Sequence, residues 1–190
     1  MPITPETDLR ERNWQVDESR ALINVHKGVA IPRLVRAWGP LSNVPLSPGD
    51  SDIDGGFRLE VEAAYSKPLG HYTLRSFSLV AQGDEEVNGV LLRTVTPLGV
   101  LRWILPRTFH LDASALSAPV MRFVAPELKP HRTTEPNGGS TSIKLTDVGT
   151  VYRLAAIVRQ PPAKAVAETF GLQTRNATYW ITRARALGLT

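Results

Sequence analysis

The stretch "AKAVAETFGLQTRNATYWITRARALGLT", residues 163–190, decides how the end of this chain folds. It contains two short helical patterns that meet at Gly171. The first pattern spans 161–171, with Pro162 near its start and the glycine at its end, which is the usual asymmetry of a helix. The second spans 174–188 and also ends at a glycine, where a left-handed residue commonly terminates a helix. We therefore predict two helices joined by a short turn.

A third helical pattern precedes these two, over residues 146–160, with Thr146 as its expected N-cap. Both longer patterns place apolar side chains on one stripe. In the earlier helix the stripe consists of Val148, Val151, Tyr152, Ala155 and Val158. In the last helix it consists of Ala177, Trp180, Ile181, Ala184 and Leu187. Three short helices with such stripes can bury a shared core, so we predict a trihelical domain.

The segment "AVAETFGLQTRNATYWITRAR" resembles the helix-turn-helix family of DNA-binding proteins. It has a small residue, Ala167, followed four positions later by Gly171, as the crossing of the two helices requires. Ala177 stands where the family prefers Val or Ile, and Trp180 is expected to fill the space. Together with "YTLRSFSLVAQGDEEVNGVLLRTVTPLGVLR", the segment is similar to uncharacterised helix-turn-helix proteins of actinobacteria and their phages. This resemblance implies architecture and carries no catalytic residue.

The last helix has a polar side that faces away from its apolar stripe. Arg can bridge the acceptors of guanine, Asn can pair with adenine, and Thr and Tyr can meet phosphates or the thymine methyl group. The candidate base and phosphate contacts are Gln173, Thr174, Arg175, Asn176, Thr178, Tyr179, Thr182 and Arg183. Lys164 and Arg185 are expected to hold phosphates.

The positive charge of the chain is concentrated at this end. Residues 144–190 contain seven Lys and Arg but two acidic residues, whereas residues 1–143 contain 15 Lys and Arg and 16 acidic residues. A net charge of +4 for the whole chain therefore arises from the last quarter. Such asymmetry is typical of a module that binds a polyanion, although a small helical domain can also be basic for no functional reason.

The chain divides at "PELKPHRTTEPNGGSTS", residues 126–142, which is rich in Pro, Gly, Ser and Thr and poor in apolar residues. We predict an α+β protein with a mixed domain over 1–128, a linker over 129–143 and a helix-turn-helix domain over 144–190. The mixed domain is expected to contain an antiparallel sheet.

Period-two patterns at 57–66 and 71–82, separated by a turn-like segment, predict an antiparallel hairpin in the first domain. Residues 96–105 predict a short helix with Thr at the N-cap and Pro in the first turn. Residues 87–95 fit either a helix or a strand, and the type of the apolar segment 21–38 stays open.

Several classes of function find little support. There is no cysteine, no apolar run near the ~20 residues that span a bilayer, and no signal peptide, so we expect a cytoplasmic protein without membrane contact. No nucleophile, zinc or phosphate-loop motif occurs, so we expect neither an enzyme nor a cofactor. "DSDIDGG" (50–56) has the spacing of a calcium loop, but Val61 occupies the position of the bidentate Glu, and an acidic turn is the simpler interpretation.

Isolated residues add little to this picture. The four histidines are scattered, with no pair at helical spacing and no acidic partner nearby in the sequence, so we expect no metal site. Trp103 lies among aliphatic residues and is expected in a core or a dimer contact.

The function that these patterns predict is sequence-specific binding of double-stranded DNA in transcriptional regulation or a phage or mobile-element process. The helix over 174–188 would enter the major groove, and the first domain could supply a homodimer contact. The alternative is a protein-interaction or phage structural adaptor that uses the helical domain to bind a partner protein.

Overall fold

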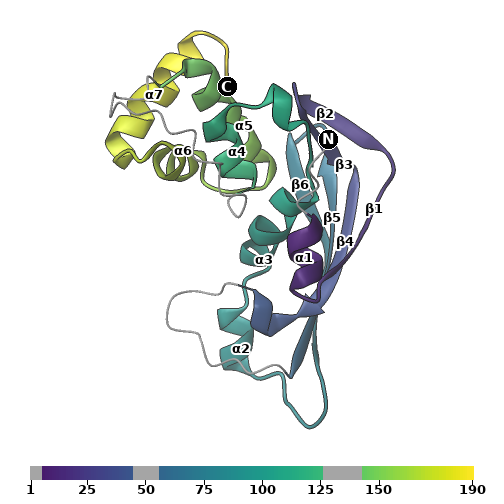
Figure 1. The fold of residues 1–190 in the computed structure, drawn as a ribbon. Helices are drawn as coiled ribbons and strands as arrows, with labels where there is room; N and C mark the ends of the chain where they lie inside the picture. Colours follow the sequence, from purple (N-terminus) through teal and green to yellow (C-terminus); the bar gives the residue numbers. More distant parts are fainter. Residues whose placement is uncertain (1–5, 45–55, 126–142) are drawn as a thin grey trace.

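A computed structural model of the protein describes residues 6–44, 56–125 and 143–190. In this part of the chain, two antiparallel sheets with short helices beside them are followed by a cluster of helices (Figure 1). The fold is therefore α+β, as the sequence predicts. No helix in these ranges has the length and apolar content that crossing a bilayer requires.

Strands dominate the first half of the chain and helices the second. The strands are β1 (Gln15–Glu18), β2 (Leu22–His26), β3 (Val29–Pro32), β4 (Leu34–Pro40), β5 (Phe57–Ser66), β6 (His71–Ala81) and β7 (His110–Leu111). The helices are α1 (Glu6–Glu11), α2 (Gly89–Thr94), α3 (Pro97–Ile104), α4 (Ala118–Val124), α5 (Leu145–Ile157), α6 (Pro162–Phe170) and α7 (Thr174–Ala186).

The larger sheet has the order β1-β4-β5-β6, and all its neighbouring strands are antiparallel. The predicted hairpin over 57–66 and 71–82 is confirmed as β5 and β6, in which Leu59 lies opposite Leu79. Alternate side chains of β5 are buried, because successive residues of a strand point to opposite faces of the sheet. The period-two pattern thus identified both the strands and the buried face.

The segment 21–38 forms β2, β3 and most of β4, which settles its type as strand. Gly28, with φ of 81°, makes the turn between β2 and β3, and β7 completes the smaller sheet in the order β2-β3-β7. Arg33 alone separates β3 from β4. Its N–H donates to the Ala21 carbonyl (3.0 Å), and its carbonyl accepts from the Tyr65 N–H (2.9 Å). The backbone of this one residue therefore joins the two sheets.

One core lies between the larger sheet and the helices α1 and α3, which cover one of its faces (Figure 1). The rings of Trp14 and Trp103 meet edge to face with centroids 5.3 Å apart. Leu9 and Ile104 are fully buried in the same core. The prediction that Trp103 packs in a core is confirmed, because only 8% of this residue is exposed.

Two short helices lie on either side of position 95, α2 before it and α3 after it. Residues 87–95 contain α2, and the Asn88 side chain caps it by accepting from two N–H groups of its first turn. The helix predicted over 96–105 is confirmed as α3, with Pro97 in its first turn. Thr96 occupies the N-cap position, but its hydroxyl makes no capping hydrogen bond.

The second portion of the protein is a cluster in which α5, α6 and α7 pack against one another. Helix α4, from the part of the sequence assigned to the first domain, packs against α5 and α6. Two details of the prediction are wrong. The N-cap of α5 is Lys144 and not Thr146, because the helix begins earlier than its apolar stripe. Leu187 is 64% exposed, since it follows the last turn of α7 and lies at the edge of the buried stripe.

The helical cluster touches the sheet portion directly. The His26 ring and the Thr150 hydroxyl share a hydrogen bond of 2.7 Å between β2 and α5. The Arg102 guanidinium donates to the Arg159 carbonyl (2.8 Å) at the end of α5. The predicted linker, 129–143, lies outside the described residues except for its last position.

Candidate nucleic-acid interface

The turn between α6 and α7 is built around a left-handed glycine. Helix α6 ends at Phe170, Gly171 has φ of 63°, and α7 begins at Thr174. The Leu172 N–H donates to the Ala167 carbonyl (2.8 Å), which satisfies one of the carbonyls left open at the helix end. The expected geometry of a tight, glycine-containing turn of three residues is therefore present.

The buried side of α7 consists mainly of small residues. Ala177 and Ala184 have no exposed surface, and Ile181 is 5% exposed. Small side chains allow the backbones of packed helices to approach closely. Trp180 is half-buried at the edge of this stripe. The stripe orients α7 so that its opposite side faces outward.

The outward side of α7 carries polar and aromatic residues. A helix turns by about 100° per residue, so side chains at spacings of three and four share a face. Arg175, Tyr179 and Thr182 therefore form a row opposite the alanine stripe. All three are exposed, and Tyr179 retains 59% of its surface. A large ring that stays this accessible is available to a partner.

Arg183 lies beside this row and stacks on two aromatic rings. Its guanidinium carbon is 5.8 Å from the ring centre of Tyr179 and 5.5 Å from that of Trp180. The two rings meet edge to face at 5.9 Å. These contacts restrain an otherwise mobile side chain while its N–H groups keep access to solvent. Arg183 is thus a partly preorganised cation.

The threonines of α7 use their hydroxyls within the helix. Thr178 donates to the Thr174 carbonyl and Thr182 to the Thr178 carbonyl, each at 3.0 Å. Their oxygen atoms and methyl groups are what they can present to a ligand. A thymine methyl contact or an accepted hydrogen bond suits them better than donation to a phosphate.

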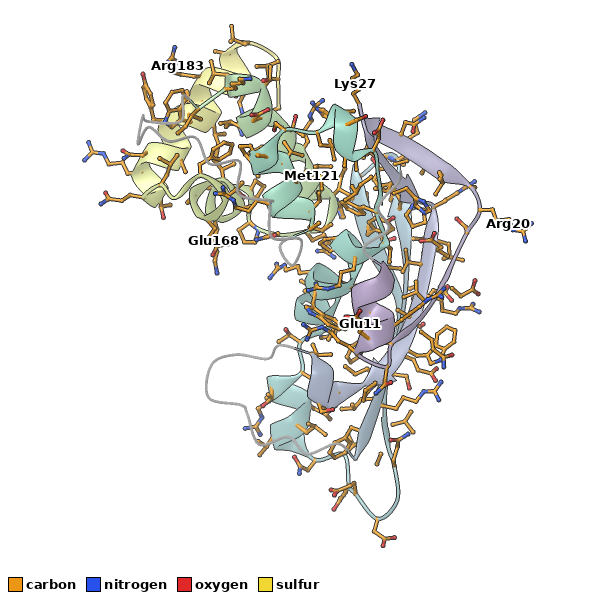
Figure 2. The ribbon with its side chains drawn as sticks, viewed as in Figure 1. Glu11, Arg20, Lys27, Met121, Glu168 and Arg183 are labelled. Carbon is orange, nitrogen blue, oxygen red and sulfur yellow. The ribbon has the colours of Figure 1, made fainter. Side chains whose placement is uncertain are left out.

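The two expected phosphate contacts have partners inside the protein. The Arg185 guanidinium donates to the Tyr152 hydroxyl (2.9 Å) and lies 5.5 Å from its ring centre, so it joins α7 to α5. Lys164 pairs with Glu168 on α6 (3.7 Å). In Figure 2, Glu168 points down from α6 whereas Arg183 points up from α7. The structure therefore does not bring Lys164 onto the face that contains Arg183.

All ten candidate residues are exposed, and α7 contains three arginines and no acid. Gln173 occupies the N-cap of α7, and its side chain makes no capping bond. N–H groups at an uncapped helix start can donate to an anion, and the helix dipole favours negative charge there. Gln173, Arg175 and Asn176 therefore surround a helix end that suits a phosphate or an acceptor on a base.

The described residues hold no group of three or more His, Asp or Glu side chains that could bind a metal ion. Asp50, Asp52 and Asp54 of the candidate calcium loop lie outside those residues. His110 does have an acidic partner: its Nε2 is 2.6 Å from Glu18 Oε1. No local pattern indicates this pair, because 92 positions separate its two residues on β1 and β7.

Comparisons of the chain with models of protein families, with curated proteins and with solved structures find no match. The physical properties of α7 and its surroundings are therefore what indicates a function for this protein.

Proposed function

We propose that this protein binds double-stranded DNA and reads sequence with α7. The observation that carries the proposal is the outward face of α7: an arginine-rich, acid-free helix that follows a three-residue turn with a left-handed glycine. A helix presented in this way fits the major groove, which is wide enough to admit it. The helical cluster supplies the rigid support that such a helix needs.

Arg175 and Asn176 lie in the first turn of α7 and would approach base edges, as the N-terminal residues of recognition helices do. Arg can make two hydrogen bonds to guanine, and Asn can make two to adenine. Among the described residues, no carboxylate forms a salt bridge with Arg175, so its guanidinium is available. Arg183, held over the rings of Tyr179 and Trp180, would contact a phosphate or a second base.

Lys164 and Arg185 have smaller roles in this proposal than the sequence predicts. Arg185 would act chiefly by fixing α7 against Tyr152 of α5. Lys164 would need to leave Glu168 to reach a phosphate, although an exposed pair of this kind contributes only about 0.3–0.5 kcal/mol. The base-reading residues are thus concentrated at the start and along the outer row of α7.

The test is binding-site selection from random duplexes, followed by fluorescence polarisation on the selected site at several salt concentrations. Arg175→Ala should weaken binding to that site by about 1–3 kcal/mol and relax selectivity at one base pair. Arg93→Ala, an exposed helical arginine on α2 with the same loss of charge, is the matched control and should leave affinity almost unchanged. If the unaltered protein shows no salt-sensitive binding even at low ionic strength, the proposal fails.

A protein-binding adaptor is the alternative, and the exposed ring of Tyr179 is the observation that favours it. Under that alternative, Tyr179→Ala abolishes capture of a partner protein while the unaltered protein binds no duplex. Under DNA binding, the same variant reduces duplex affinity.

We also propose that a homodimer forms along the open edge of β6, because specific DNA readers commonly bind as symmetric pairs. The Gln82 N–H points to β5, where it donates to the Gly56 carbonyl (2.6 Å). Since N–H groups alternate along a strand, those of Leu79 and Phe77 point away from β5. Leu79→Pro removes one of these outward N–H donors. In sedimentation analysis this variant should therefore be a monomer where the unaltered protein is a dimer. A monomeric unaltered protein at micromolar concentration would contradict this proposal.

A further inference from the structure

A second feature of the protein is a cleft of about 970 Å³ on the side of α5 that faces the sheets. Its walls come from β2, from the turn that joins β5 to β6, and from the C-terminal half of α5. Volumes of this size are typical of sites for small organic ligands. The cleft therefore lies where the sheet portion and the helical cluster meet, and the candidate residues on the outward face of α7 do not line it.

Three cations from separate parts of the chain line the cleft. Arg33 comes from the junction of β3 and β4, Lys67 from the β5–β6 turn and Arg153 from α5. None of the described lining residues is acidic. No described carboxylate forms a salt bridge with any of the three. Cations that line one cleft without counter-charges create a positive potential that attracts an anion.

The rest of the lining is apolar and aromatic. Leu22, which is 45% exposed, lies on β2, and Ile157 lies on α5. Tyr65 comes from β5 and Tyr152 from α5, and the ring of each contacts a neighbouring side chain. Tyr65 packs edge to face on the fully buried Tyr72 with centroids 5.7 Å apart. Tyr152 accepts from Arg185. Restrained aromatic walls bind a ring or an aliphatic body with little loss of entropy.

We propose that this cleft binds a small organic anion, with its apolar or aromatic body between the tyrosines and its acidic group among Arg33, Lys67 and Arg153. An uncharged ligand would gain no electrostatic attraction from these three exposed cations, whereas an anion would. A DNA backbone would use convex surface charges, whereas these cations surround a hollow whose walls are partly apolar. The combination therefore fits an amphipathic carboxylate, sulfonate or phosphate.

The test uses two fluorescent probes of similar shape: the anion 8-anilinonaphthalene-1-sulfonate and the uncharged N-phenyl-1-naphthylamine. The full chain is titrated with each probe, without DNA. The double variant Arg33→Gln, Arg153→Gln should bind the anionic probe about tenfold more weakly and the uncharged probe unchanged. The double variant Arg75→Gln, Arg93→Gln removes the same charge at exposed sites away from the cleft and should alter neither affinity.

A variant that blocks the cleft locates the probe. Ala156 lines the cleft from α5, so Ala156→Phe should displace both probes, with retained folding shown by circular dichroism. If the double cleft variant unfolds, the single Arg153→Gln protein carries the same test with a smaller loss, about threefold. Equal weakening in the control variant, or unchanged binding of the sulfonate in the cleft variants, overturns the proposal. Displacement of the sulfonate by a short duplex at one equivalent would also overturn it, because the cations would then belong to a DNA-binding surface.

Discussion

Substitution of Gly149 by Ala probes how the end of α7 is fixed to α5. Gly149 lies in the middle of α5, where the chain that follows α7 crosses it. A Cβ atom at this position would overlap the carbonyl oxygen of Leu189 and would lie 2.9 Å from the carbonyl carbon. The obstacle is backbone, so a change of rotamer cannot relieve the overlap.

The size of the effect follows from two opposing contributions. Ala in place of Gly in a helix interior normally stabilises by about 1 kcal/mol. Overpacking costs about 1–3 kcal/mol, and displacing Leu189 endangers its hydrogen bond to the Ala184 carbonyl (3.0 Å), worth about 0.5–1.5 kcal/mol. The clash prevails, so Gly149→Ala should lower the free energy of unfolding by about 1–3 kcal/mol. For a chain of this length, the melting temperature falls by about 2–4 °C per kcal/mol.

Thermal melting followed by circular dichroism measures this change, and Gly89→Ala is the matched control. A Cβ on Gly89 meets only the end of the Arg93 side chain, at 3.9 Å. The control should therefore leave the melting temperature unchanged or raise it slightly. A second background, in which the chain ends after Gly188, removes the obstacle, and there Gly149→Ala should become neutral or stabilising.

The reasoning is refuted if Gly149→Ala raises the melting temperature of the full chain as the control does. It is also refuted if the destabilisation persists in the shortened chain. In either case the segment after α7 would not pack on α5, and the orientation of α7 would depend on other contacts.

Three further predictions concern single residues. Arg159, just after α5, has φ of 60°, a left-handed conformation that glycine adopts without strain. Arg159→Gly should therefore raise the free energy of unfolding, measured by urea titration, by about 0.5–1 kcal/mol. A lower free energy of unfolding would show that the Arg159 side chain stabilises the fold by more than the backbone strain costs. Burial raises the pKa of Tyr72, whose hydroxyl donates to the Pro32 carbonyl. The folded protein therefore binds this proton more tightly than the unfolded chain does. The contribution of Tyr72 to the free energy of unfolding is fully present below about pH 10 and is lost as the pH rises above it. Tyr72→Phe should flatten that decline in urea titrations at several pH values. Ile181→Ala should lower the free energy of unfolding by about 2–4 kcal/mol in the same titration, because Ile181 is only 5% exposed on the buried side of α7. A smaller decrease would mean that the apolar stripe of α7 packs loosely.

Local patterns in the sequence determined much of the fold. The alternation over 57–66 and 71–82 identified β5 and β6 and their buried faces. The glycines at 171 and 188 identified the ends of α6 and α7, and both have positive φ. These features depend on neighbours within a few positions, and periodicity and end residues record such neighbours directly. The exposure of the candidate residues on α6 and α7 follows from the same periodicity, whereas Gln173 is exposed in the turn between these helices.

Contacts between distant segments were decided only by the tertiary structure. Apolar residues over 21–38 suit a helix or a strand, and strand pairing with β5 and β7 made the choice. Two side-chain contacts join elements far apart in the chain: the Glu18–His110 pair and the hydrogen bond that Arg185 donates to Tyr152. The cleft brings together Arg33, Lys67 and Arg153, which lie too far apart in the chain for any short sequence window to contain them. Propensity and periodicity act over one or two turns of chain, whereas packing selects which of the compatible local structures meet.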